Sequence, residues 1–243
     1  MYKHSEFILS STTEILETGI NACAGIGEGI ETYSVCDYIM QSIFLKMTGF
    51  QEQKMKFICW ELASNDYEYR RGFSKTILGE CSSFGEKQSI YKDLVGQIEK
   101  YGTFDINSLD KTQILSTAKT EVENLFSNSN LMYSAQYNFD EFKKIWGTIK
   151  VGDFVTDPNT LMAEINGRVS LKKIYTDHLY LHRNRIAHNS QSFQKNLPRL
   201  QSLILDNYRY ENYFLWFSVL IVLDKVFIDI YKDYLEALQN KIY

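Results

Sequence analysis

The sequence predicts an all-α protein, and three observations lead to this fold class. Proline is scarce, with 2 residues in 243, so few positions force a helix to end. Apolar residues recur at spacings of three and four over long stretches, which is the period of an amphipathic helix. The hydrophobic share of 44% and the charged share of 23% suit a folded core and exclude a disordered chain. We therefore expect one helical unit that covers residues 1–243.

The first part of the chain is expected to hold a series of helices. The pattern predicts a helix from Ser5 to Asn21 and, after a glycine-punctuated connection, a second from Ile30 to Met47 that ends at Gly49. A third helix is expected from Gln51 to Arg70, followed by a less regular connection from Gly72 to Gly85. Shorter helices are then predicted at Lys87 to Lys100, Leu109 to Phe126 and Asp140 to Trp146.

Two signals near the middle of the chain predict a change of structure. A small β-hairpin is expected at residues 148–156, with its turn at Gly152 and Asp153. Asp157 followed by Pro158 is typical of a helix N-terminus, so a short helix is expected from there to Ile165.

The C-terminal part contains the helices that carry the most informative residues. Ser170 is expected to cap a helix that runs through Leu181 into the segment RNRIAHN, and Pro198 marks a further start. The final helix, from Glu211 to Asn240, is apolar around too much of its circumference to face water on one side. It is expected to lie in the core, or in the core and against another subunit.

Cysteines and apolar runs limit the class of protein. The four cysteines are at least 13 positions apart and form no CxxC motif, so we expect reduced core thiols rather than disulfides or a zinc site. No secretory signal is recognisable at the N-terminus, which leads us to expect a cytoplasmic protein. The longest apolar stretch, Tyr213 to Leu223, is too short to span a membrane.

The charge is unevenly distributed along the chain. The net charge is −4, but the segment from Ile165 to Tyr210 carries eight Lys and Arg against two Asp and so has a charge of +6. The remainder therefore carries −10. A basic segment on an acidic body favours a local site for a polyanion, and a solvated charged face is the alternative.

Three of the four histidines fall within eleven residues of that basic segment. His178 and His182 are four apart, and Arg185 and Asn189 continue the same helical stripe. Two histidines at this spacing can bind zinc, but the glutamate of an HExxH motif and a third ligand are missing. Packing of either ring against a neighbour is the other alternative.

A second arrangement begins at Arg183. Arg183 and Asn184 are followed by His188, which combines a cationic fork for phosphate, an orienting amide and a group that can move a proton near neutral pH. These three groups could cleave RNA without a metal, with the 2'-hydroxyl as nucleophile. On an ideal helix Arg183 lies about 140° from His188, so we expect two copies of the chain to combine their groups around a shared axis.

The Arg-Asn-x3-His motif, in a helical chain with a long apolar helix after it, resembles the HEPN superfamily (higher eukaryotes and prokaryotes nucleotide-binding domain). The resemblance covers the motif and its flanking helices, residues 170–241. It implies an all-α HEPN-like bundle, with additional helices here, and a homodimer. It also implies metal-independent endoribonuclease activity of the kind found in toxins, anti-phage systems and type VI CRISPR effectors.

Carried onto this sequence, the resemblance assigns the catalytic role to Arg183, Asn184 and His188, and requires no cofactor or metal. Further RNA contacts are expected from the neighbouring polar and basic side chains Arg185, His182, Asn189 and Lys195. HEPN toxins controlled by nucleotide transfer carry a tyrosine two residues after the histidine. Ser190 stands there instead, so this form of control is not expected, and an antitoxin or sensor protein is left open as a partner.

We therefore expect an endoribonuclease that cuts single-stranded or loop RNA, tRNA anticodon loops included, in a toxin or anti-phage role. The alternative is a catalytically inactive dimeric adaptor that binds RNA, a nucleotide or a protein. Aromatic side chains in the basic segment could stack on unpaired bases, or could pack in the core instead. They are Tyr175, Tyr180, Phe193, Tyr208 and Tyr210.

Overall fold

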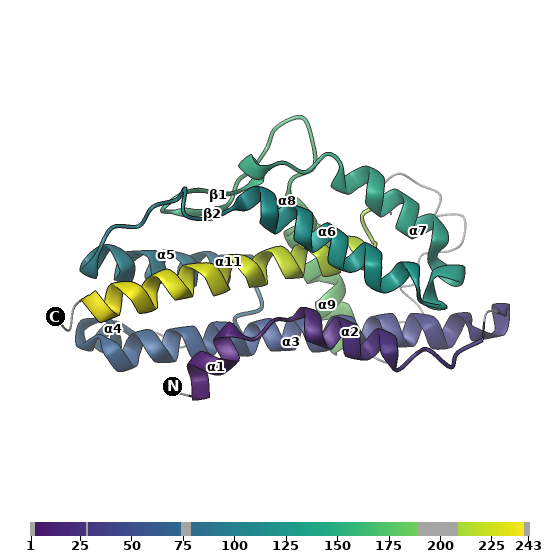
Figure 1. The fold of residues 1–243 in the computed structure, drawn as a ribbon, viewed down its shortest axis with the longest axis horizontal. Helices are drawn as coiled ribbons and strands as arrows, with labels where there is room; N and C mark the ends of the chain where they lie inside the picture. Colours follow the sequence, from purple (N-terminus) through teal and green to yellow (C-terminus); the bar gives the residue numbers. More distant parts are fainter. Residues whose placement is uncertain (1–2, 28, 74–78, 189–208, 241–243) are drawn as a thin grey trace.

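The computed structural model describes residues 3–27, 29–73, 79–188 and 209–240 and is mainly helical, as predicted (Figure 1). Its helices are α1 (Lys3–Leu9), α2 (Thr13–Asn21), α3 (Tyr33–Asn65), α4 (Tyr67–Phe73), α5 (Phe84–Tyr101), α6 (Lys111–Ser127), α7 (Leu131–Trp146), α8 (Leu171–Lys173), α9 (Tyr180–His188) and α11 (Tyr213–Asn240). Short 3-10 turns η1 (Ile30–Thr32) and η2 (Val151–Asp153), a π-helical segment η3 (Ile174–Leu179) and the strands β1 (Phe154–Asp157) and β2 (Thr160–Met162) complete the described elements.

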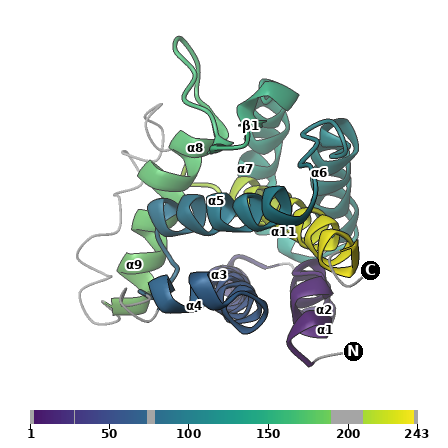
Figure 2. The same ribbon diagram turned by 90° about the vertical axis from the view of Figure 1, so that its left-hand side faces the viewer.

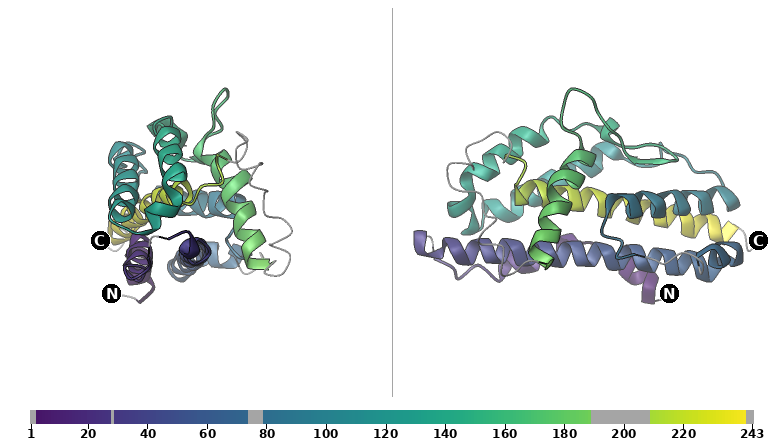
Figure 3. Two further views of the ribbon diagram at one scale, coloured as in Figure 1. Left: turned by 90° about the vertical axis from the view of Figure 1, so that its right-hand side faces the viewer. Right: turned by 180° about the vertical axis from the view of Figure 1, so that it is seen from behind.

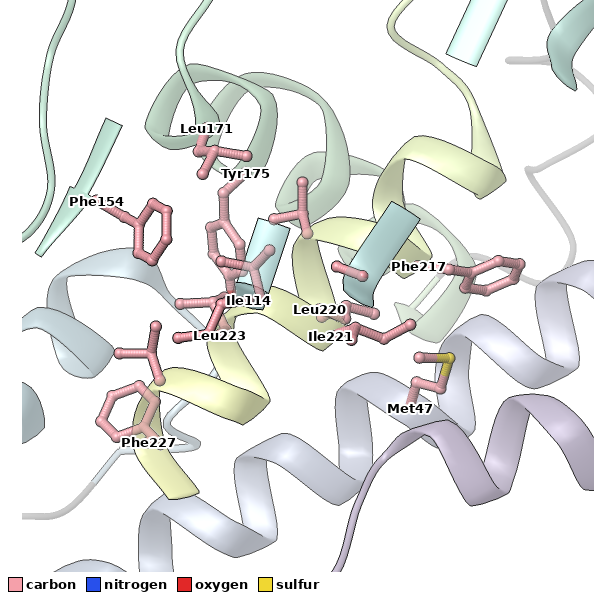
Figure 4. Packing of buried hydrophobic residues seen from close by; sticks show 14 of the residues in the cluster. Met47, Ile114, Phe154, Leu171, Tyr175, Phe217, Leu220, Ile221, Leu223 and Phe227 are labelled. Carbon is pink, nitrogen blue, oxygen red and sulfur yellow. The ribbon is translucent and has the colours of Figure 1, made fainter. Parts of the chain in front are cut away.

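The final helix α11 lies at the centre of the molecule. It packs against α3 on one side, against α6 and α7 on another, and beside α5 (Figures 1 and 2). In Figure 4 its side chains lie between Met47 of α3 and the residues Leu171 and Tyr175 that lead to the RNRIAHN segment. Trp216 and Leu220 are each 1% exposed. The all-round apolar character of the final helix is thus explained by burial within the chain.

The prediction of a single helix from Ser5 to Asn21 was wrong, because this segment forms two helices, α1 and α2. The chain breaks at residues 10–12, where backbone groups bind the side chains of a buried ion pair. Lys54 donates to the carbonyl of Ser10 at 2.7 Å, and the amide of Thr12 donates to the Asp224 carboxylate at 2.9 Å. The single N–H of Thr12 is used by Asp224 and therefore does not donate within a helix, and local sequence does not report this competition.

The predicted end at Gly49 was also wrong, because α3 runs without interruption from Tyr33 to Asn65. A glycine inside a helix costs only about 1 kcal/mol relative to alanine. Burial of the residues on either side, such as Met47 and Met55, offsets that cost. The helix ends instead at Asn65, and the next residue, Asp66, opens α4 because its carboxylate accepts from the amide of Tyr69 at 2.8 Å.

The three shorter helices predicted next are present as α5, α6 and α7, and α5 and α7 are longer than predicted. Ser83 and Glu86 form a capping box that opens α5, and Asp110 caps α6 by accepting from the amide of Gln113 at 2.8 Å. Helix α7 begins at Leu131, nine residues before the predicted start at Asp140.

The hairpin is present but lies further along the chain than predicted. Strand β1 (Phe154–Asp157) pairs antiparallel with β2 (Thr160–Met162), and Asp157 faces Thr160 across the turn. Asp157 accepts from the amide of Asn159 at 2.7 Å, so Asp157 and Pro158 form a hairpin turn and no helix follows to Ile165. Asp-Pro fits both a turn and a helix N-terminus, and the local sequence could not choose between them.

The helix with the RNRIAHN segment begins as predicted, since the Ser170 hydroxyl accepts from the amide of Lys173 at 3.3 Å. It continues through the π-helical segment η3, which was not predicted, into α9. The final helix starts at Tyr213, two residues later than predicted, because the carboxamide of Asn212 accepts from the amides of Phe214 and Leu215.

All four cysteines, Cys23, Cys36, Cys59 and Cys81, are buried and unbridged, which agrees with their prediction as core thiols. Over the described residues, the structure contains no helix with both the length and the apolar character needed to cross a membrane.

Candidate active site

The motif-bearing helix α9 crosses the long helix α3 at the side of the molecule (Figures 2 and 3). The crossing brings residues 182–185 against two separate surfaces. One is the middle of α3, and the other is the start of α11. Because α9 is bound to both, the side chains at the beginning of the motif have defined partners.

Arg183 points to α3. Its Nη2 lies 2.9 and 3.0 Å from the two carboxylate oxygens of Glu52, and its Nη1 donates to the side-chain oxygen of Asn184 at 3.1 Å. The side chains of Arg183 and Glu52 are 15% and 12% exposed. The structure thus brings together two of the three predicted catalytic residues, and it adds an acidic partner on another helix.

Glu52 was not predicted from the sequence, because it lies 131 positions before Arg183. One signal could have drawn attention to it. Gln51, Glu52 and Lys54 are polar residues at buried positions of a helix whose neighbouring core positions are apolar. Buried polar residues that interrupt an apolar stripe need partners, and these partners often come from distant segments.

A small, partly open cavity of about 10 Å³ lies beside the Arg183–Glu52 pair. Its polar lining includes Gln51 and Glu52 of α3, Lys87 of α5 and Arg183 of α9. The remaining lining residues are Thr48, Ser82, Tyr175, Leu179, Tyr180 and Leu220. This volume is close to the minimum that holds one water molecule.

His182 faces the start of α11 and is a core residue. Its ring packs against Phe44, Tyr213 and Trp216, its Nε2 lies 2.8 Å from the hydroxyl of Tyr213, and 9% of the residue is exposed. Burial lowers the pKa of His182 to about 3, and the nearby charge of Arg185 adds to this shift. A neutral ring enclosed in this way is not available to RNA, so the expected RNA contact at His182 does not fit the structure.

His178 and Arg185 face the same side of the motif helix as His182, as the predicted stripe requires. The His178 ring lies 5.2 Å from that of Tyr210, and Arg185 forms a 3.2 Å ion pair with Glu211. The Arg185 side chain is 35% exposed, so it could also meet a ligand. Among the described residues, no three His, Cys, Asp or Glu side chains are gathered as a metal ion would need.

Part of the predicted site lies outside what the structure describes. His188 ends α9, and its backbone is helical, but its side chain is outside the described set. The predicted RNA contacts Asn189 and Lys195 lie outside the described residues as well, as do Ser190, Phe193, Pro198 and Tyr208.

The described aromatic residues of the basic segment differ in exposure. Tyr175 is 2% exposed, and its hydroxyl donates to the carbonyl of Ser82 at 2.7 Å, so it packs in the core and cannot stack on a base. Tyr180 and Tyr210 are half-buried at the surface of the core. For Tyr175, core packing rather than stacking on RNA bases is therefore the observed arrangement.

Comparisons of the chain with protein-family models, with curated proteins and with solved structures gave no match. A proposed function therefore has to be argued from the chemistry of the site and from the motif.

Proposed function

We propose that the protein is a metal-independent endoribonuclease that cuts single-stranded or loop RNA at a site composed of two copies of the chain. The observation that carries the proposal is the setting of Arg183. Its guanidinium is held by Glu52 of α3 and by Asn184, and Arg183 and Asn184 lie on the same short helix that ends at His188. An arginine whose rotamer is already fixed loses less conformational entropy when it binds a phosphate.

The reaction uses groups that this chain supplies. His188 removes the proton from a 2'-hydroxyl, the 2'-oxygen attacks the adjacent phosphorus, and the bond from phosphorus to the 5'-oxygen breaks. A protonated histidine gives a proton to the leaving 5'-oxygen. Arg183 stabilises the pentacoordinate phosphorane, and Asn184 orients the phosphate or His188. The products carry a 2',3'-cyclic phosphate and a 5'-hydroxyl.

The geometry of the motif helix favours a site composed of two copies. Residues 180–188 are α-helical, so positions 183 and 188 lie about 140° apart around the helix axis. Arg183 is directed to α3 of its own chain. A histidine from a second copy can approach the phosphate from the opposite side.

The first experiment measures cleavage by the purified full chain in EDTA. A panel of tRNA, structured RNA, duplex RNA and single-stranded DNA is the substrate, and the product ends are identified. We expect cleavage in unpaired RNA, no cleavage of DNA, and loss of activity in Arg183→Ala and His188→Ala. His4→Ala and Arg70→Ala change the same residue types on α1 and α4 and should remain active.

Complementation tests the composite site. The inactive Arg183→Ala and His188→Ala proteins, mixed and allowed to exchange subunits, should regain part of the cleavage because mixed dimers contain one intact pair. A stable monomer in sedimentation at micromolar concentration, or cleavage that requires Mg²⁺ and leaves 5'-phosphates, would contradict the proposal.

A non-catalytic adaptor is the second candidate, and one observation favours it. Glu52 neutralises the charge of Arg183 that a phosphate would otherwise meet. In that case the dimer would bind RNA, a nucleotide or a protein without turnover. RNA binding that persists in His188→Ala, with no cleavage of any substrate in the wild-type protein, would favour the adaptor.

For the nuclease we propose a role as a toxin or in anti-phage defence, with an antitoxin or sensor protein as its control. Growth arrest on expression, abolished by His188→Ala, tests this role. A culture that grows normally while the protein cleaves RNA in vitro would contradict it, unless growth stops when a phage is added.

A further inference from the structure

Lys87 is the most deeply buried charged group beside the candidate site. It lies on α5, is 2% exposed, and is one of the lining residues of the small cavity next to Arg183. Its Nζ donates to the carbonyl oxygens of Cys81 at 2.6 Å and Ser82 at 3.4 Å. Lys87 is nearly fully buried and forms no ion pair with any of the residues that the structure describes, which calls for an explanation because a buried charge is costly without a partner.

Three helices contribute the charges around this lysine. Glu52 of α3 and Arg183 of α9 line the same cavity as Lys87, and Glu86 precedes Lys87 on α5. The carboxylate of Glu86 is engaged by the amides of Cys81 and Ser83. Glu52 is therefore the carboxylate that Lys87 and Arg183 have in common.

The cavity supplies the connection between the two cations. An ammonium carries three N–H groups, and the two carbonyls accept from two of them. Gln51 also lines the cavity: its Oε1 is buried and has no hydrogen-bond partner among the described residues, while its Nε2 donates to the carbonyl of Leu220 at 2.6 Å. One water in the cavity could accept from Lys87 and donate to both Gln51 and Glu52, which satisfies every group.

The segment that Lys87 holds is itself strained. Cys81 has a φ of 59°, in the left-handed region that non-glycine residues rarely occupy. Lys87 binds the carbonyl of Cys81, and the Tyr175 hydroxyl binds the next carbonyl. The ring of Tyr175 also lies 5.4 Å from the Lys87 Nζ, a cation–π contact. Strain of this kind persists where surrounding contacts over-determine the backbone, and it is common near functional sites.

We propose that Lys87 is a positioning residue of the candidate active site, and that it sets the position of Arg183 through Glu52 and one internal water. The inference rests on the proposed function for its catalytic consequence. With Lys87 charged, Glu52 divides its attraction between two cations, and Arg183 is free to turn part of its fork to a phosphate. With Lys87 neutral, Glu52 holds Arg183 alone and draws it away from the substrate.

The protonation state of Lys87 can change near physiological pH. Burial lowers the pKa of Lys87 to about 8. The charge of Arg183 adds to this shift, and it is opposed by Glu52, Cys81 and Glu86. Cleavage at saturating RNA should therefore fall as the pH rises through 8, with little change in KM. In Lys87→Met the part of this fall with its midpoint near pH 8 should be absent, which leaves only the fall caused by loss of the protonated histidine. The rate of this variant at pH 7 should be at least tenfold below that of the wild-type protein.

Lys111→Met is the matched control. Lys111 also donates to a backbone carbonyl, that of Val155 at 2.6 Å, and its pKa is also lowered by burial, but it lies on α6 away from α9. This variant should keep both the rate and the pH profile of the wild-type protein. An unchanged profile in Lys87→Met would overturn the proposal, since loss of a purely structural contact lowers the rate without removing one titration.

A second set of measurements does not depend on RNA cleavage. The ¹⁵N resonance of the Arg183 side chain, assigned by its loss in Arg183→Lys, should shift in the wild-type protein with a midpoint near pH 8. Urea unfolding adds a coupling test, because the midpoint shift caused by Lys87→Met should differ between the wild-type and Glu52→Gln backgrounds. A flat resonance together with additive shifts would overturn the inference. Absence of cleavage in the wild-type protein, with this coupling present, would instead contradict the proposed function alone.

Discussion

Two charged residues of α3, Glu52 and Lys54, stand two positions apart and have different surroundings. Lys54 forms a 2.5 Å ion pair with Asp224 in which the side chains are 0% and 1% exposed. The second oxygen of Asp224 accepts from the amide of Thr12, and Lys54 also donates to the carbonyl of Ser10. Burial lowers the pKa of Lys54 and raises that of Asp224, and their mutual attraction opposes both shifts.

The pair formed by Glu52 has a looser environment. Its partner Arg183 is 15% exposed, a cavity lies beside it, and the neighbouring Gln51 has an unpartnered oxygen. The comparison shows that buried charged residues can have two different roles within one helix. The almost fully buried Lys54–Asp224 pair ties the segment between α1 and α2 to α3 and α11. The Arg183–Glu52 pair is partly exposed, so its charged groups can respond to a ligand.

The largest expected effect is on RNA cleavage, which should depend on the Arg183–Glu52 pair. Arg183→Ala should lower RNA cleavage by about 10² to 10⁴-fold, the range of a lost transition-state group, without loss of the fold. Initial rates and near-UV circular dichroism of the same preparation measure both quantities. If cleavage persists at the wild-type rate, Arg183 is a structural partner of Glu52, and the contrast with Lys54 disappears.

The second prediction concerns the closed pair. Lys54→Met should lower the free energy of unfolding by about 3–5 kcal/mol, because Asp224 is left buried without its counter-charge. Urea unfolding gives the value. The double variant Lys54→Met/Asp224→Leu should recover much of the loss, and a double variant as unstable as the single one would show that the buried charge is not the cause.

The third prediction uses the lowered pKa of Lys87. In the unfolded chain this lysine titrates near its ordinary value of 10.5, so between pH 8 and 10.5 the unfolded state binds more protons, and stability rises with pH. Relative to Lys87→Met, the wild-type protein should gain about 2 kcal/mol between pH 7.5 and 9.5. Urea unfolding over this range measures the gain. The raised pKa of Cys59 lowers stability as the pH rises, and this effect cancels when the unfolding free energy of Lys87→Met is subtracted from that of the wild-type protein. Parallel curves would contradict the lowered pKa of Lys87 in the folded protein.

The fourth prediction concerns acid. The pKa of His182 is about 3 when folded and 6.5 at its ordinary value, so the unfolded state binds the proton first, and stability falls as the pH drops below 6.5. The loss between pH 7 and 5 should approach 2 kcal/mol, roughly one and a half pKa units. His182→Gln should show a smaller loss over this interval in thermal or urea unfolding. An equal loss would assign the acid sensitivity to other groups.

The smallest effect is expected at a third charged residue of α3. Lys56 lies 3.1 Å from Glu80, and the two side chains are 33% and 75% exposed. Lys56→Ala should change the free energy of unfolding by no more than about 0.5 kcal/mol, as is usual for exposed ion pairs. A loss comparable to that of Lys54→Met would mean that burial does not set the difference between these pairs.

The sequence by itself determined the fold class, the helical character of most segments, and the helix starts that depend on local capping, such as the one at Ser170. It also determined that Arg183 and Asn184 stand together on one helix and that the final helix is buried. These features depend on residues within one or two turns of each other, so local spacing and hydrogen-bonding chemistry are sufficient to predict them.

Only the tertiary structure decided where α1 ends, whether α3 continues through Gly49, and which form Asp157 and Pro158 adopt. The same holds for the site, because Glu52 and Lys87 come to Arg183 from 131 and 96 positions away. The interior placement of His182 likewise depends on Phe44 and Trp216 of other helices. Whether a helix breaks or continues, and whether a charge can be buried, depends on distant groups that bond or pack against the segment. The local sequence does not contain those partners.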